Sequence, residues 1–297
     1  MANQTKKGGD ATACSPGDLS KTQVKETTFE NTKLSAVKLD WKEVYYTNCP
    51  LISAANVDQE LGWTKSEFKK IGVNYLYLRA RKENDWYPHY IHNLDNLIRF
   101  GGLFPPVHVH ADIRRTRLLG VTHAPREGGA LMVRAGDDIF RMAELKGKKI
   151  GLSKSLNRIK TDWWRIQEHQ GTELMLRING MTMDDVQLVE FPYPDDWYND
   201  PKMMGPEMEN PSELWLKRDH KRDLAFRPLE TALEKGVIDA AYVQSGPLQQ
   251  LQEATGKFTA IEDLSRHPDW RLQVANIPAA ITCTEEMATK HPELAVT

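Results

Sequence analysis

Three side chains in distinctive local settings are able to carry out chemistry: a cysteine, a histidine and an arginine. Cys49 lies in the segment YYTNCP, His89 in PHY and Arg99 in RFGG. A thiol is an acid or a nucleophile, an imidazole can tune its protonation, and a guanidinium is a fixed cation for an anionic substrate. This combination indicates chemistry and not only binding.

The residues around Cys49 predict that it lies at a corner between a strand and a helix. Val44 to Thr47 are β-branched and aromatic, which is typical of a strand, and Pro50 suits the first turn of a helix. The Cys49 sulfur would then lie near the positive end of the helix dipole, where a thiolate is stabilised. The alternative is a small buried apolar residue, the usual place of a free cysteine.

The composition indicates a globular protein without a bias toward nucleic acid or membrane. The chain has 297 residues and a formal charge of −2, so we expect no nucleic-acid partner. It has no apolar run long enough to span a bilayer, and no apolar stretch follows Lys6 and Lys7. Its three cysteines are widely spaced and form neither a metal pattern nor a disulfide framework. We therefore expect a cytoplasmic, reduced protein, and we take it to be a monomer.

Alternating strand and helix patterns begin at about residue 39 and predict an α/β protein with a parallel sheet. Before them, residues 1–37 are polar and resemble a flexible leader. We expect one lobe from residues 38–122 together with 247–297, and a second lobe from residues 123–246. A long helix is predicted over Trp163 to Ile178.

Two phrases resemble a known group of proteins. LKGKKIG at 145–151 and LEKGVIDA at 233–240 are similar to strand entries of solute-binding proteins for nitrate, sulfonates and taurine. This resemblance implies a two-lobe periplasmic-binding-protein-like (type II) fold, with a cleft between the lobes.

The settings of the three reactive residues are more specific. The NCP corner, the histidine, the RFGG motif that begins ten residues after it, and TRLLGVT at 116–122 resemble the family of 2'-hydroxybiphenyl-2-sulfinate desulfinases, which act in dibenzothiophene desulfurisation. The resemblance implies a hydrolase acting on carbon–sulfur bonds without a cofactor. Cys49 would be the catalytic thiol, His89 its partner and Arg99 the anchor for the sulfinate, and the Gly102 backbone N–H would be a further donor.

A sulfinate is a compact anion with two oxygens, which suits the planar donors of an arginine. Glycines let backbone N–H groups approach such an anion closely. An aromatic side chain can stack on an aromatic substrate, and a helix N-terminus favours an anion. We expect the substrate, a small aromatic anion, to contact residues of both lobes, namely Asn48, Tyr90, Gly101, Gly102, Ser153, Asn157 and Trp163.

The sequence leaves the mechanism and the activity open. Cys49 is able to protonate the ring carbon as a general acid, or to attack sulfur as a thiolate. A receptor for a small sulfonate or carboxylate, or a related hydrolase or decarboxylase on the same scaffold, also fits. His89 and Arg99 also have interpretations without a function: His89 would be an exposed loop residue, and Arg99 would form a salt bridge.

One motif resembles a metal site but sits in the wrong kind of element. HVHAD at 108–112 has the spacing of a histidine pair that binds metal from a strand. Here it follows two prolines and is predicted to be helical, where residues two apart point in different directions. We therefore expect no metal.

Overall fold

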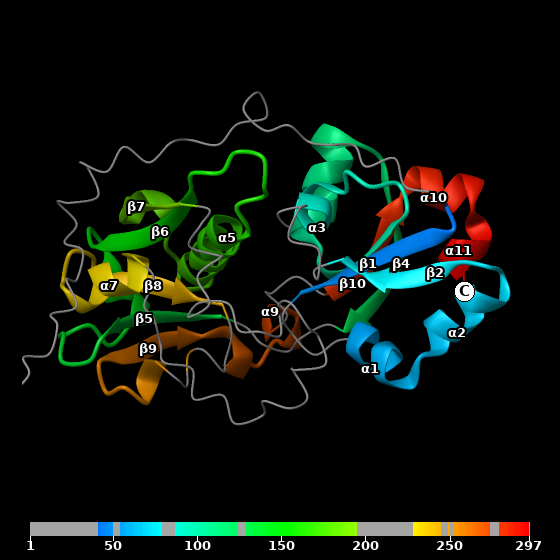
Figure 1. The fold of residues 1–297 in the computed structure, drawn as a ribbon. Coiled ribbons are helices and arrows are strands. Elements are labelled where there is room, and N and C mark those ends of the chain that lie inside the picture. The colour runs from blue at the N-terminus through cyan, green and yellow to red at the C-terminus, as the bar shows by residue number, and fades with distance from the viewer. Residues whose placement is uncertain are drawn as a thin grey trace, which may run out of the picture.

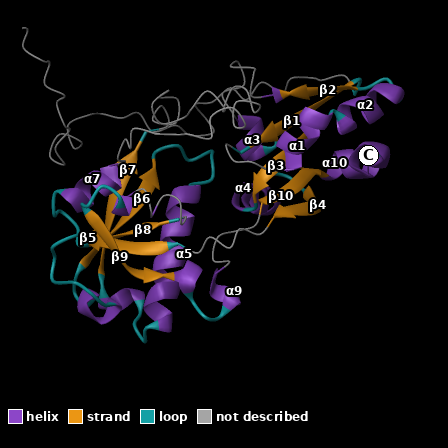
Figure 2. Cartoon of the chain, turned by 90° about the horizontal axis from the view of Figure 1, so that it is seen from below, coloured by secondary structure: helices purple, strands orange, loops and turns teal. Residues whose placement is uncertain are grey.

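The computed structural model describes residues 41–49, 54–78, 87–123, 129–194, 228–244, 249, 252–273 and 279–296. These residues form two lobes, and each lobe contains a five-stranded sheet with helices packed on it (Figures 1 and 2). The predicted leader at 1–37 lies outside the described residues.

The sheet of the first lobe combines strands from both ends of the chain. Its order is β2-β1-β3-β10-β4. β1 is parallel to β2 and β3, and β10 runs antiparallel to β3 and β4. The strand bounds are Glu43–Asn48 for β1, Asn74–Tyr77 for β2, Leu97–Gly102 for β3, Thr116–His123 for β4 and Ala279–Thr284 for β10.

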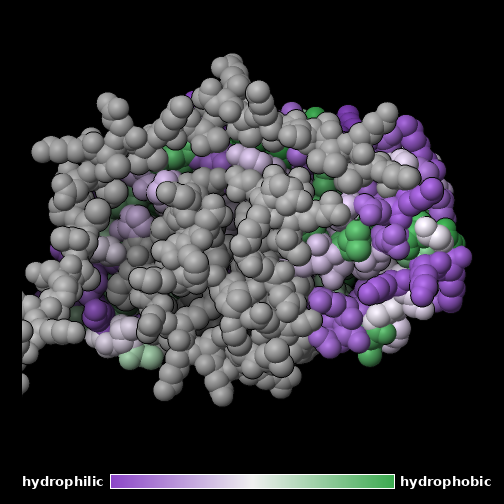
Figure 3. Space-filling view, viewed as in Figure 1, coloured by the Kyte–Doolittle hydropathy of each residue, from purple (hydrophilic) through white to green (hydrophobic). Residues whose placement is uncertain are grey.

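Short helices cover this sheet. They are α1 (Ala54–Leu61), α2 (Trp63–Lys70), α3 (Tyr87–Ile91), α4 (Phe104–His108), the π-helical turn η4 (Val109–Ile113), α10 (Glu285–Lys290) and α11 (Pro292–Val296). Apolar residues of the strands and helices form a core that includes Val44, Phe68, Ile98 and Met287. In Figure 3 the described surface of this lobe is mainly hydrophilic, with isolated hydrophobic residues. The buried apolar core of this lobe is therefore built by both the sheet and its helices.

The sheet of the second lobe has the order β7-β6-β8-β5-β9. β6 is parallel to β7 and β8, whereas β5 is antiparallel to β8 and β9. The bounds are Ala130–Arg134 for β5, Lys149–Ser155 for β6, Gln187–Tyr193 for β7, Ala240–Val243 for β8 and Phe258–Asp263 for β9.

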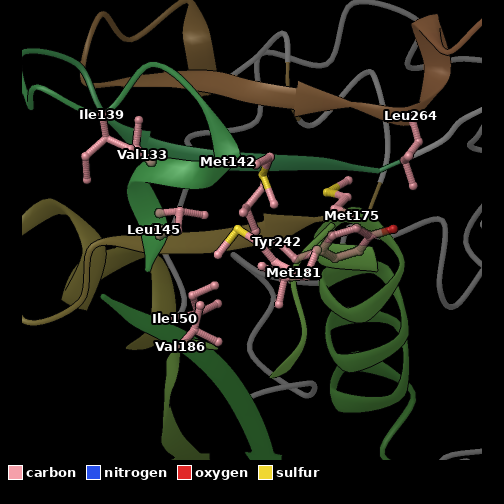
Figure 4. Packing of buried hydrophobic residues seen from close by; sticks show 13 residues of the cluster. Val133, Ile139, Met142, Leu145, Ile150, Met175, Met181, Val186, Tyr242 and Leu264 are labelled. Atoms are coloured by element: carbon pink, nitrogen blue, oxygen red, sulfur yellow. The ribbon is translucent and has the colours of Figure 1, made fainter. Parts of the chain in front are cut away.

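Helix α5 (Trp163–Ile178) is the longest element of the second lobe among the described residues. Asp162 caps its first turn by accepting a hydrogen bond from the backbone N–H of Arg165. The other helical segments are η5 (Met142–Leu145), η6 (Met183–Asp185), α7 (Pro228–Glu234), η9 (Leu264–Arg266) and α9 (Trp270–Gln273). Figure 4 shows the core between α5 and the sheet, where Met175, Met181 and Tyr242 meet Ile150 and Val186.

Two sequence predictions about this fold were wrong. The sheets are mixed rather than parallel, because β10 is antiparallel to β3 and β4, and β5 is antiparallel to β8 and β9. Only residues 124–129 separate β4 in the first sheet from β5 in the second, so β5 enters its sheet directly from the other lobe and not through a strand–helix–strand crossover. The lobe boundary at 247 also differs, since β9 pairs with β5 and the chain rejoins the first sheet only at β10.

Within the described residues, no helix combines the length and the apolar character needed to cross a membrane.

The ring of Tyr242 packs closely against two glycines, Gly129 and Gly171. A Cβ at Gly171 would lie 2.1 Å from the Tyr242 ring, and one at Gly129 would lie 2.0 Å from its hydroxyl oxygen. Tyr242 is only 1% exposed, so its ring has little room to move. We expect Gly171→Ala to lower the free energy of unfolding by about 1–3 kcal/mol, because overpacking outweighs a helix-propensity gain of about 1 kcal/mol.

The free energy of unfolding is measured by urea denaturation of Gly171→Ala and of a control variant. Gly120→Ala is the control, because a Cβ there has nothing within 4 Å, and it should change stability by less than about 0.5 kcal/mol. Equal stabilities of the two variants would contradict the tight packing around Tyr242.

Candidate active site

Cys49 lies directly after β1, at the end of the strand. Its backbone N–H donates to the carbonyl of Phe100 at 3.0 Å, so the pairing of β1 with β3 continues through this residue. The side chain is half-buried. The described helix α1 begins at Ala54, and residues 50–53 lie outside the described part of the chain. The predicted corner is therefore present on its strand side.

His89 faces the thiol from helix α3. Its Nε2 lies 3.4 Å from Cys49 Sγ, and its Nδ1 lies 2.8 Å from Thr47 Oγ1. The imidazole is 2% exposed, so both ring nitrogens have their contacts in the protein interior. The structure thus joins a thiol, an imidazole and a hydroxyl in one hydrogen-bonded chain.

Thr47 is a site residue that the sequence analysis did not single out. It precedes Cys49 by two positions on β1, and residues two apart on a strand share a face. When the hydroxyl of Thr47 accepts from Nδ1–H, Nε2 is an acceptor for the thiol proton. When the hydroxyl donates to Nδ1, Nε2–H can donate to a thiolate. The spacing of two residues from Cys49 along a strand is the sequence signal that could have identified Thr47.

Arg99 is among the largest fully buried side chains of the structure, with 1% exposed area. It lies on β3, next to β1, and its register partner there is Thr47. Its Nε donates to the carbonyl of His89 at 2.7 Å, and Nη1 donates to the carbonyl of Gly102 at 2.8 Å. The guanidinium therefore ties helix α3 to the end of β3.

Gly101 is the point at which the thiol and the guanidinium meet. A Cβ built there would lie 2.4 Å from Cys49 Sγ, 3.1 Å from Arg99 Nη2 and 3.2 Å from Arg99 Nη1. A side chain at this position would displace the sulfur, and only glycine leaves the required space. At Gly102 a Cβ has nothing within 4 Å. The predicted trio of Cys49, His89 and Arg99 is thus brought together, with the two glycines beside it.

Two of the other predicted substrate contacts lie close to this trio. The Tyr90 ring packs edge-on against the His89 ring, with centroids 5.3 Å apart. Asn48 is buried and donates from Nδ2 to Asn56 Oδ1 at 2.9 Å, which ties the end of β1 to α1. Tyr90 thus lies against the histidine of the trio, whereas the side chain of Asn48 joins β1 to α1.

The predicted contacts from the second lobe have different surroundings. Ser153 is buried, and its N–H and hydroxyl both donate to the carboxylate of Glu168 on α5, so this hydroxyl has a structural contact. Trp163 is half-buried and stacks on Trp164, with centroids 4.0 Å apart. The described contacts do not join Ser153 or Trp163 to the thiol.

Asn157 lies where the two lobes touch. Its Oδ1 accepts from the N–H of Ile159 at 2.8 Å, and its Nδ2 donates to the hydroxyl of Tyr87 at 3.4 Å. Ile159 packs with Tyr87 and Val109, and the ammonium of Lys160 lies 5.5 Å from the centre of the Tyr90 ring. A loop of the second lobe is therefore anchored on helix α3, beside His89.

The histidine pair at 108 and 110 lies on helical turns, as predicted. His108 Nδ1 contacts Thr161 Oγ1 at 2.9 Å, whereas His110 Nδ1 lies 3.1 Å from the carbonyl of Thr116. The two rings therefore serve different neighbours. No group of three or more metal-binding side chains occurs among the residues that the structure describes.

Solved structures of two kinds of protein resemble this chain. One is a cysteine-to-serine variant of DSZB in complex with biphenyl-2-sulfinic acid, with 23% identity, coverage of 85% of this chain and 72% of that chain, and a TM-score of 0.55. Another is a putative periplasmic sulfonate-binding protein SsuA from Methylobacillus flagellatus KT, with 16% identity, coverage of 86% and 65%, and a TM-score of 0.52. The aliphatic sulphonate-binding protein SsuA from Escherichia coli gives 12% identity, coverage of 84% and 68%, and a TM-score of 0.51.

No protein-family model and no curated protein matches the sequence. The chain spans about two thirds of the length of the solved structures that it resembles. At these identities the likeness shows the fold alone. The chain has the two-lobe α/β fold of periplasmic solute-binding proteins, which confirms the fold class predicted from the sequence.

Proposed function

We propose that this protein is an aryl-sulfinate desulfinase, which cleaves an aromatic C–S bond and releases sulfite. The observation that carries the proposal is the meeting of the Cys49 thiol, the His89 imidazole and the Arg99 guanidinium around Gly101. A proton donor or nucleophile, its tuning group and a buried cation are the three parts that this reaction requires.

Arg99 supplies the charge that recognises the anion. Hydrogen bonds to the carbonyls of His89 and Gly102 help to fix the plane of the guanidinium. Carbonyl acceptors are uncharged, so these two contacts orient the guanidinium. Burial strengthens its attraction for a sulfinate, because the local dielectric constant is lower than that of water. The Gly102 N–H would be a second donor to the same anion.

The reaction balances with water as the only co-reactant. An aryl sulfinate and water give the arene and hydrogen sulfite: the electron pair of the C–S bond stays with the ring carbon, and that carbon gains a proton. In one route the Cys49 thiol gives this proton, and water adds to the departing sulfur dioxide. In the other route the thiolate bonds to sulfur, and water later releases it as sulfite. His89 adjusts the protonation of Cys49 in both.

Two further observations support an aromatic sulfur oxyanion as substrate. The Tyr90 ring lies beside His89, where it can contact an arene. The DSZB structure that this fold resembles holds biphenyl-2-sulfinic acid, and the SsuA structures belong to sulfonate-binding proteins. A sulfur oxyanion thus fits both kinds of neighbour, and the thiol favours turnover over binding alone.

Removing the thiol should abolish turnover but preserve binding. We expect Cys49→Ser to reduce the release of sulfite from biphenyl-2-sulfinate by roughly 10²-fold or more, because serine is a far weaker acid and nucleophile than cysteine. Sulfite is measured colorimetrically, and binding is measured as a rise in the melting temperature with added sulfinate. The variant should keep this rise.

The same experiment separates the rival activities. A rise in melting temperature with no sulfite from the unsubstituted protein would contradict the proposal and indicate a receptor. Arene release from biphenyl-2-carboxylate, with none from the sulfinate, would instead indicate a decarboxylase.

Gly101→Ala tests the geometry of the thiol. The added Cβ would lie 2.4 Å from Cys49 Sγ, so we expect the sulfur to rotate away from His89 and the rate to fall by about 10²-fold. Turnover of biphenyl-2-sulfinate is the measurement. Gly120→Ala on β4 is the matched control, since it adds the same methyl group into open space and should keep full activity. Equal rates for the two variants would show that the thiol does not need this position.

A further inference from the structure

Three residues form a row across the centre of the first sheet. In the register of the strands, Arg99 on β3 pairs with Thr47 on β1 and with Thr282 on β10. Residues in register on adjacent strands point to the same face, so the two hydroxyls flank the arginine. All three are 1% exposed. The row joins strands from opposite ends of the chain.

Helix α3 lies over this row, and two histidines meet it: His89 from the helix and His92, which directly follows the last helical residue. His89 Nδ1 lies 2.8 Å from Thr47 Oγ1, and His92 Nε2 lies 3.2 Å from Thr282 Oγ1. Each histidine thus meets one of the two threonines, and Arg99 Nε donates to the carbonyl of His89 between them.

The end of the helix is held firmly at His92. This residue is fully buried and has a φ of 49°, in the left-handed region that non-glycine residues seldom adopt. Its N–H donates to the carbonyl of Pro88 at 3.1 Å, and its own carbonyl accepts from Arg114 Nη1 at 3.0 Å. An unusual backbone conformation persists only where the surroundings determine it.

We propose that His92 and Thr282 are positioning residues that hold helix α3 on the sheet and thereby keep the His89 ring against the Cys49 thiol. Neither residue touches the sulfur, and each acts through His89. The part of the inference that concerns turnover rests on the proposed function, whereas the part that concerns the thiol does not. Strand β10, far along the chain, thus sets the geometry of a site built from residues 47–102.

His92 is neutral in the folded protein. Burial is the main cause that holds its pKa well below the usual histidine value, and the positive charges of Arg99 and Arg114 add to it. Asp95 and Glu286 face the same region, where they bind Arg114. A neutral imidazole can form its hydrogen bond with the Thr282 hydroxyl. A protonated imidazole would instead add a third positive charge beside Arg99 and Arg114.

This neutral state predicts how stability depends on pH. The unfolded chain takes up a proton on His92 as the pH falls through about 6.5, whereas the folded chain does not, so stability is full above this pH and declines below it. Melting temperatures between pH 7.5 and 5 should therefore fall less steeply for His92→Gln than for the unsubstituted protein. Parallel curves would contradict a neutral His92.

Thr282→Val tests the positioning role directly. It keeps the shape of the side chain and removes the hydroxyl, so we expect the His89 ring to lose its fixed place. The alkylation rate of Cys49 by iodoacetamide, measured from pH 5 to 10 by peptide mass spectrometry, should then show a shifted pH midpoint. Sulfite release should fall by roughly 10-fold to 100-fold in kcat, with KM changing less than about twofold. Thr282→Ser, which restores a hydroxyl, should recover both properties.

Thr284→Val is the matched control. Thr284 is a buried threonine on the same strand whose hydroxyl donates to the carbonyl of Asp95 and accepts from the N–H of Met287, and its described hydrogen bonds do not include either histidine. Loss of that hydroxyl should leave the alkylation profile of Cys49 unchanged. The proposal is overturned if Thr282→Val leaves the profile unchanged, or if Thr284→Val shifts it equally. A shifted profile in a protein that releases no sulfite would uphold the positioning role and refute only the desulfinase activity.

Discussion

A positive charge buried in the first lobe is the constraint on which the site depends. Removing a guanidinium from water costs several kcal/mol unless its donors are satisfied. Arg99 meets this requirement with backbone carbonyls from two elements, those of His89 on α3 and Gly102 on β3. The arginine therefore fixes the helix that carries the histidine and the strand end that carries the glycines. The same contacts that make burial tolerable also assemble the candidate site.

The sheet explains why the site needs segments that are far apart in the sequence. Strands β1 and β3 place Cys49, Arg99 and Gly101 at one end of the sheet, and β10 packs beside β3 after the chain has passed through the second lobe. The second lobe in turn sends the loop with Asn157 and Ile159 onto helix α3. Helix α3, which has only five residues, thus takes contacts from β1, β3 and the second lobe, and His92 directly after it contacts β10.

The sequence was sufficient where local chemistry decides the structure. Helix α5 has the predicted bounds, because Asp162 caps its start and Gly180, with φ of 72°, follows its end. Cys49, His89 and Arg99 were found because each lies in a short motif, and the turn residues around them are part of those motifs. Thr47 was missed because it has no motif of its own, although it lies two positions before Cys49 along a strand.

The remaining features depend on contacts between distant segments. Nothing local shows that Thr282 stands in register with Arg99, since this pairing arises from a crossover between the lobes. The same is true of β9, which joins the second sheet although its sequence lies beyond the predicted boundary. Ser153 has a structural contact because its hydroxyl donates to the buried carboxylate of Glu168 on α5. The residues next to Ser153 in the sequence do not show this contact.

The most direct measurement is a crystal structure of the Cys49→Ser variant with biphenyl-2-sulfinate. We expect the sulfinate oxygens to lie about 3 Å from the guanidinium of Arg99 and from the N–H of Gly102, with the sulfur atom next to residue 49 and His89. An anion bound elsewhere on the protein, or a guanidinium that keeps only its backbone partners and makes no contact with the sulfinate, would contradict this expectation.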